Sequence, residues 1–276
     1  MLLAAALLAL AQTTQAPPHT GRIIPLPDAA IAYVPATAPP HPPLLVLLHG
    51  AGHEQALMLQ HFEPEADERG IVLLAPDSQG VTWDSVAIAE EPPSPDSPLG
   101  HDLAHRFGNS RDAKRVAAAI ASLERQVPID RARTVLAGFS DGATFALAMG
   151  LSRDYPFAAV IAWSPGIAIE TEGAAKGRRV FVSHGRQDPL LAFQTTCGEI
   201  VPLLRSEGAN VTFLPFDGAH DAPVWLKDTF LDAAFGHVSG SKAVPLPASA
   251  PVCHGTTPGM PDNMPQQPPT TMMGPG

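Results

Sequence analysis

The sequence predicts an α/β fold in which a mostly parallel sheet is covered by helices on both faces. Short, continuously apolar segments such as 42–50 and 70–77 alternate with longer segments of helical periodicity. Strands that are apolar on both sides are typical of parallel sheets buried beneath helices. The 276 residues are enough for one sizeable hydrophobic core, and no linker divides the middle of the chain.

The expected elements follow one another in a regular order. Residues 22–35 predict a short hairpin, and residues 54–69 predict a helical stretch that Pro64 interrupts. An amphipathic helix is expected at 110–127, because apolar side chains recur with helical spacing at Val116, Ala119, Ile120 and Leu123. The other strands are expected within 42–50, 70–77, 133–139, 158–165, 178–185 and 210–218. The other helices are expected within 142–152, 193–208 and 222–235. Pro202 predicts a kink or a late start in the second of these helices.

The two ends of the chain differ in composition from its middle. Residues 1–16 form an apolar stretch that ends in small and polar residues, which is typical of a secretory signal peptide and predicts export to the periplasm or cell exterior. Residues 241–276 are rich in Pro, Thr, Gly and Met, which predicts a disordered tail. A single folded domain is therefore expected at 17–240, with one long loop at 78–108.

Charge and cysteine content limit the classes of partner. The net charge of −10 argues against a surface that neutralises nucleic-acid phosphates. The apolar stretch at 1–16 is shorter than the roughly 20 residues that a membrane-spanning helix needs. Two cysteines, Cys197 and Cys253, are too few for a disulfide-built scaffold or a Cys-rich zinc site, and they either pair or remain free thiols.

Ser140 is the strongest candidate for a catalytic residue. It lies in Gly138-Phe139-Ser140-Asp141-Gly142, between an expected strand and an expected helix. Glycines two residues either side of a serine allow a tight strand-to-helix turn that presents the hydroxyl at the edge of the sheet. This pattern predicts a nucleophilic serine.

A serine nucleophile needs a base and an orienting carboxylate, which in this architecture follow it in the order acid, then histidine. His220 is the best candidate base, because it lies in the loop between the last expected strand and helix. Asp188 is the best candidate acid, since it follows a strand end, whereas Asp217 and Asp221 are too close in sequence to His220. We expect His184 to support the loop that carries Asp188.

An oxyanion site needs backbone N–H donors close to the serine. The amide of Asp141, directly after Ser140, is one candidate, and the amide of Ala51 in the glycine-rich loop after an early strand is the other. Trp83, Phe139 and Trp163 lie near expected strand ends and are candidates for lining the substrate pocket. The segment between the expected strands that contain Trp163 and Arg178 is too short for a large cap domain, which predicts an open site.

Several of these motifs together resemble the α/β-hydrolase superfamily, and most nearly its phospholipase/carboxylesterase-type serine esterases. The matching pieces are LLHGAG, DSQGVTWD, GFSDGATFALAMGL, AWSPG, VFVSHGRQDPLL and FDGAH, within 43–235. The resemblance implies Ser140, Asp188 and His220 as a catalytic triad, Ala51 and Asp141 as the oxyanion hole, and no metal or organic cofactor. Many members have Gln directly after the nucleophile, where this chain has Asp141.

The expected function is therefore hydrolysis of carboxylic esters through an acyl-enzyme, on short- to medium-chain esters and on the ends of polyester chains. The same triad also serves peptidases and amidases, so that alternative stays open. A non-catalytic binding protein on a hydrolase fold is a third interpretation. The oligomeric state cannot be predicted from this sequence.

Overall fold

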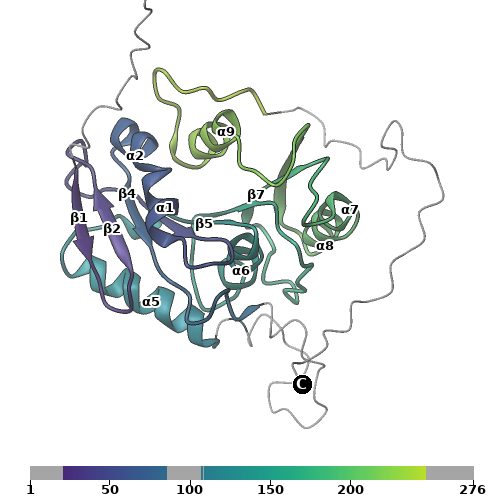
Figure 1. Ribbon diagram of the computed structural model, residues 1–276, viewed down its shortest axis with the longest axis horizontal. Coiled ribbons are helices and arrows are strands. Elements are labelled where there is room, and N and C mark those ends of the chain that lie inside the picture. Colours follow the sequence, from purple (N-terminus) through teal and green to yellow (C-terminus); the bar gives the residue numbers. More distant parts are fainter. Residues whose placement is uncertain (1–20, 86–106, 108, 247–276) are drawn as a thin grey trace, which may run out of the picture.

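The computed structural model describes residues 21–85, 107 and 109–246, and within them it confirms the predicted α/β architecture (Figure 1). Its sheet has eight strands in the order β1-β2-β4-β3-β5-β6-β7-β8. The first two strands pair antiparallel, and β2 is antiparallel to β4, whereas all pairings from β4 to β8 are parallel. The strands are β1 Arg22–Pro25, β2 Ile31–Val34, β3 Leu44–Leu48, β4 Val72–Ala75, β5 Thr134–Phe139, β6 Ala159–Trp163, β7 Arg179–Gly185 and β8 Asn210–Phe216.

Helices cover both faces of this sheet, as the apolar strands require. One face packs against α1 Gln55–Gln60, α2 Glu63–Arg69 and α9 Val224–Phe235, through side chains such as Phe62 and Phe230. The other face packs against α5 Arg111–Glu124, α6 Asp141–Gly150 and α8 Val201–Ser206, through side chains such as Val116 and Phe145. Figure 1 shows the sheet between these two sets of helices.

Proline and capping residues set the helix limits where the sequence predicts them. Pro64 lies in the first turn of α2, so the expected stretch at 54–69 is divided into α1 and α2. Pro202 likewise lies in the first turn of α8, and the preceding Phe193–Ile200 forms a short α7 (Phe193–Thr195) followed by a π-helical turn. At the start of α5, the Ser110 hydroxyl accepts a hydrogen bond from the Ala113 amide.

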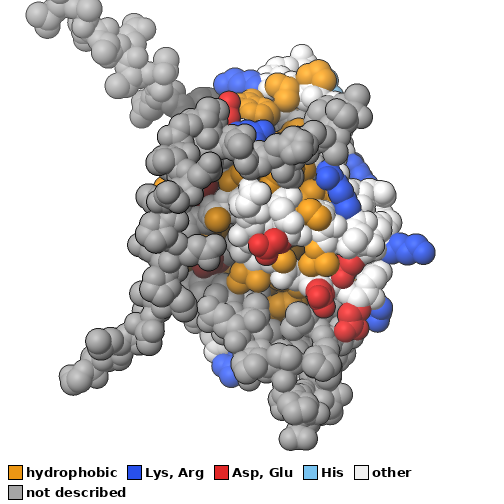
Figure 2. All heavy atoms as spheres, turned by 90° about the vertical axis from the view of Figure 1, so that its right-hand side faces the viewer, with side chains coloured by type: hydrophobic (Ala, Val, Ile, Leu, Met, Phe, Trp, Pro, Cys, Tyr) orange, Lys and Arg blue, Asp and Glu red, His pale blue; other side chains and the backbone are white. Residues whose placement is uncertain are grey.

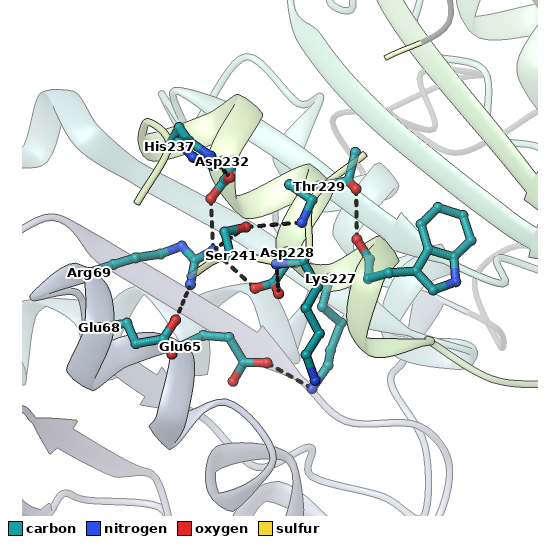
Figure 3. Close-up of polar contacts among 12 residues, drawn as sticks. Glu65, Glu68, Arg69, Lys227, Asp228, Thr229, Asp232, His237 and Ser241 are labelled. Carbon is teal, nitrogen blue, oxygen red and sulfur yellow. Dashed lines mark hydrogen bonds and ion pairs between the residues drawn. The ribbon is translucent and has the colours of Figure 1, made fainter. Parts of the chain in front are cut away.

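Residues 241–246, which follow the predicted domain boundary at 240, form hydrogen bonds with α9. The Lys242 amide donates to Asp228 Oδ2 and the Val244 amide donates to Thr229 Oγ1, so the described residues 241–246 lie along α9. Arg69 on α2 pairs with Asp228 and with Asp232, and all three side chains are more than nine-tenths buried (Figure 3). Polar side chains of α9 therefore bind residues 241–246, the beginning of the segment that the sequence predicts to be disordered. Residues 1–20, 86–106 and 247–276 lie outside the described residues.

The surface at the β7 and α8 end carries side chains of mixed character. Figure 2 shows its described hydrophobic side chains scattered among polar ones, with Lys and Arg side chains standing apart rather than in one cluster. No helix among the described residues is long and apolar enough to cross a membrane.

Candidate active site

Ser140 occupies a strained turn between β5 and α6. Its φ of 57° and ψ of −122° lie in a region that non-glycine residues rarely adopt. A side chain at Gly138 would place Cβ 2.0 Å from the Gly142 carbonyl oxygen, and one at Gly142 would place it 2.3 Å from the His49 carbonyl oxygen. Both glycines are therefore required sterically, as the G-x-S-x-G pattern predicts, and the elbow geometry is present.

The acid and base predicted from the sequence are in direct contact. His220, in the loop between β8 and α9, places Nδ1 2.6 Å from Asp188 Oδ2. Asp188 follows β7, and its other carboxylate oxygen accepts the amides of Leu190 at 2.9 Å and Leu191 at 3.0 Å. Because the carboxyl ends of parallel strands lie at one edge of the sheet, β5, β7 and β8 bring the serine, acid and base to the same side.

The environment of Asp188 keeps its carboxylate charged. Its side chain is fully buried, and burial alone would raise its pKa. Hydrogen bonds from Leu191, His220 and Leu190 outweigh that effect and hold the pKa of Asp188 below its ordinary value. A buried, ionised acid is what an orienting partner of a catalytic histidine must be.

His184 is a second histidine on the same carboxylate. Its Nε2 lies 3.1 Å from Asp188 Oδ2 and 3.0 Å from the Leu191 carbonyl oxygen, while Nδ1 lies 2.7 Å from Thr196 Oγ1. Both groups near Nε2 are acceptors, so this nitrogen carries a proton. Burial lowers the pKa of His184, which favours the neutral ring. His184 thus supports the loop of Asp188, as expected from the sequence.

The competing acids have other partners. Asp217 has a largely exposed side chain and lies 3.4 Å from Arg186 Nε, and Asp221 accepts the amide of Ala222 at 2.7 Å. His237, which also follows Ser140 in the sequence, lies against Asp232 on α9, as Figure 3 shows. Among the described residues, only Asp188 is within hydrogen-bond distance of the His220 ring.

Ser140 and His220 share one wall of the site without a hydrogen bond between them in the described structure. The ring of Phe139, next to Ser140, packs on the ring of His220 with centroids 4.7 Å apart. A Cβ on Gly50 would lie 3.4 Å from Ser140 Cβ, so the loop after β3 also reaches the serine. Catalytic hydrogen bonds are often long or poorly aligned in the absence of substrate and tighten when substrate binds.

The two candidate oxyanion donors lie on either side of Ser140. Asp141 is the first residue of α6, and Ala51 is exposed in the loop beside Gly50. Within the described part of the chain, neither amide donates a hydrogen bond, which leaves both available to a ligand. The Asp141 carboxylate is turned toward Thr82, whose Oγ1 donates to Asp141 Oδ2 at 2.5 Å.

A pocket of about 230 Å³ opens beside His220. Phe139 and Trp163 contribute to its wall, together with Leu57 and Met58 of α1, Phe62 just before α2 and Ala222 just before α9. Sequence reasoning missed these last four residues because the elements that carry them meet only in the folded chain.

Trp83 does not line this pocket. It is fully buried, its Nε1 donates to the His49 carbonyl oxygen at 2.8 Å, and its ring stacks on Phe145. It therefore supports the loop that carries Ala51 from beneath, which differs from the substrate-binding role expected from the sequence. Residues 78–85 reinforce the loop that carries Ala51, since the Gly52 amide donates to the Val81 carbonyl oxygen.

Cys197 is disulfide-bonded, and no described cysteine is free. Cys253, the other cysteine of the sequence, lies outside the described residues.

Comparisons with known proteins agree with this architecture. Residues 101–224 match the model of the phospholipase/carboxylesterase family. The bifunctional acetylxylan esterase/xylanase XynS20E of Neocallimastix patriciarum is 27% identical over 174 residues, covering 60% of this chain. The match spans only 22% of that relative's length.

Solved structures share the fold at low sequence identity. The poly(3-hydroxybutyrate) depolymerase LpqC of Bordetella parapertussis superposes with a TM-score of 0.57 at 18% identity, over 80% of this chain and 92% of its own. The acetyl xylan esterase of Aspergillus awamori gives a TM-score of 0.54 at 14% identity, over 77% and 97% of the two chains. With its strained serine elbow, its mostly parallel sheet and the family match over residues 101–224, this chain is similar to the phospholipase/carboxylesterase family of the α/β hydrolases.

Proposed function

We propose that this protein hydrolyses carboxylic esters with Ser140 as nucleophile, His220 as base and Asp188 as acid. The observation that carries the proposal is the 2.6 Å contact between His220 Nδ1 and the buried Asp188 carboxylate, at the same sheet edge as the strained Ser140. The match of residues 101–224 to the phospholipase/carboxylesterase family model supports the same reaction class.

In the proposed mechanism, Ser140 Oγ attacks the ester carbonyl and gives its proton to His220 Nε2. Asp188 holds the proton on Nδ1, so that Nε2 presents its lone pair to the serine, and stabilises the imidazolium that forms. The amides of Ala51 and Asp141 then bind the oxyanion. His220 returns the proton to the leaving alcohol, and a water activated by His220 releases the acid from the acyl-enzyme.

The pocket supports a preference for short- to medium-chain acyl groups. Its volume of about 230 Å³ is below the ~300–1,000 Å³ of pockets that enclose drug-sized ligands. Residues 164–178, between β6 and β7, contribute no long helix that could cover the serine. The structural relatives named for acetyl xylan and poly(3-hydroxybutyrate) are consistent with carbohydrate acetates or polyester chain ends as substrates.

Hydrolysis of p-nitrophenyl esters from acetyl to palmitoyl tests this proposal, with Ser140→Ala as the control. We expect activity to be highest with the short acyl chains and to be lost in the variant. Absence of turnover with every ester, in a folded protein that also fails to react with a fluorophosphonate probe, would favour the non-catalytic interpretation. Probe labelling at Ser140 without ester turnover would favour a peptidase or amidase.

We also propose that the protein is exported. The apolar segment 1–16 supports this, and the disulfide at Cys197 agrees with it, because disulfides persist in oxidising compartments. Mass spectrometry of the secreted chain, expected to begin near Pro17, tests the proposal. Recovery of the chain only in the cytoplasm, with residues 1–16 still attached, would contradict it.

A further inference from the structure

A cluster of three potential metal ligands lies beside the loop that carries Ala51, the candidate oxyanion donor. His49 Nε2, His53 Nδ1 and one carboxylate oxygen of Asp77 all lie within 4.8 Å of one another. Asp77 Oδ1 is 3.2 Å from His49 Nε2 and 2.9 Å from His53 Nδ1. We propose that these three side chains bind one divalent transition-metal ion of the Zn²⁺ type, next to the catalytic site and distinct from it.

The sheet explains why these residues meet. Strands β3 and β4 are parallel neighbours with Leu44 opposite Val72 and Val46 opposite Leu74. When this register is continued past the ends of the two strands, His49 lies opposite Asp77. The chain then turns through Gly52, and His53, with a left-handed φ of 58°, returns its ring to the same carboxylate. Two distant segments of sequence are thus joined at one point.

The proton positions leave a nitrogen of His49 free to bind a cation. Nδ1 of this fully buried ring lies 2.5 Å from the Gly50 carbonyl oxygen, which can only accept, so Nδ1 carries the proton. Nε2 therefore presents a lone pair toward Asp77 Oδ1. The Ser78 amide also donates to Nε2, at 3.2 Å, and this is the one hydrogen bond of His49 that an ion would replace.

His53 can offer its ligating nitrogen without a change in charge. Its ring is about two-fifths exposed, and its contact with Asp77 requires only that the proton lie on Nδ1. When an ion takes that position, the proton moves to solvent-facing Nε2, which keeps the ring neutral. Asp77 supplies one negative charge and has a side chain that is 13% exposed, so water can complete the coordination.

Distances and donor types fit a tetrahedral ion. Ligand atoms about 2.1 Å from zinc lie about 3.4 Å apart in a regular tetrahedron. The separations of 3.2 and 2.9 Å from Asp77 Oδ1 are within a few tenths of an ångström of this value, and the two ring nitrogens lie within 4.8 Å of each other. Two imidazoles and a carboxylate suit Zn²⁺ and its neighbours in the first transition row, whereas Mg²⁺ and Ca²⁺ prefer oxygen ligands.

An ion at this position would connect both ends of the loop that carries Ala51. His49 precedes the loop and His53 follows it, while Gly50 lies against Ser140. The ion would thus be a regulator or stabiliser of the loop rather than a reactant. The cluster is not visible in the sequence, because its ligands are not spaced as a recognised metal motif.

Isothermal titration of the full, tag-free chain with ZnCl₂ tests the proposal. We expect one Zn²⁺ per chain in the wild type and in Ser140→Ala. Since loss of outer-shell partners alone costs about 10–100-fold in metal affinity, loss of a ligand in His53→Ala or Asp77→Asn should weaken binding by more than about 100-fold. His41→Ala is the matched control, because His41 is an exposed histidine that contacts Pro128 instead, and it should bind as the wild type does.

Two results would overturn the proposal: no saturable Zn²⁺ binding by the wild type, or unchanged affinity in both His53→Ala and Asp77→Asn. Circular dichroism of each variant separates lost ligands from lost folding. Because the readout is bound metal, the outcome does not depend on ester hydrolysis.

Discussion

Replacing Asp188 by asparagine is expected to disable the base while leaving the site assembled. One oxygen of Asp188 accepts the amides of Leu190 and Leu191, so the side-chain oxygen of asparagine must stay there. The NH₂ group then occupies the position of Oδ2, facing His220 Nδ1 at about the present 2.6 Å separation. An N–H donor at that place requires Nδ1 to accept.

The consequence is the wrong tautomer of His220. With Nδ1 unprotonated, the ring carries its proton on Nε2 and cannot take the proton of Ser140. The NH₂ group also faces the proton on His184 Nε2, which adds a donor–donor contact. We expect kcat to fall by about 10⁴-fold, as for the equivalent change in other triads, which corresponds to about 5 kcal/mol in the activation barrier.

The assay measures the turnover of p-nitrophenyl butyrate. The rate is divided by the concentration of fluorophosphonate-reactive sites for the wild type, and by the concentration of folded protein for the variant. Asp217→Asn is the matched control and should retain nearly full activity, since Asp217 is exposed and pairs only with Arg186 among the described residues. Retention of more than about a tenth of wild-type kcat by Asp188→Asn would refute the tautomer argument. Loss of activity in Asp217→Asn instead would identify a different acid.

Further predictions concern stability. Gly142→Ala should lower the free energy of unfolding by about 1–3 kcal/mol or more, because the added Cβ meets backbone oxygens of Leu48 and His49. Urea denaturation measures this change. Gly198→Ala is the control and should change the free energy of unfolding little, because its Cβ has no contact closer than 3.8 Å. Burial lowers the pKa of His184 in the folded chain. Below about pH 6.5, His184 therefore binds a proton more readily in the unfolded chain than in the folded one, and the free energy of unfolding should decrease as pH falls. His184→Asn should flatten this dependence between pH 7.5 and 5, and an unchanged slope would contradict the assignment.

Local sequence patterns were sufficient for most of the architecture. Runs such as 44–48 and 134–139 are apolar at successive positions because both of their faces are buried, and this is visible without a structure. Pro64 and Pro202 mark helix starts through the same local chemistry that the sequence analysis used. The amides of Lys242 and Val244 donate to side chains of α9, a contact between segments that composition does not reveal.

The sequence by itself determined the parallel sheet, the serine elbow and the order in which serine, acid and base candidates occur. These depend on short-range patterns: glycines around Ser140, apolar runs, and residues placed just after strands. Tertiary structure alone decided that Trp83 lies beneath the loop that carries Ala51 instead of in the pocket, and that Leu57, Met58 and Phe62 line that pocket. Such contacts depend on the register and spacing of strands far apart in the chain, which no local pattern specifies.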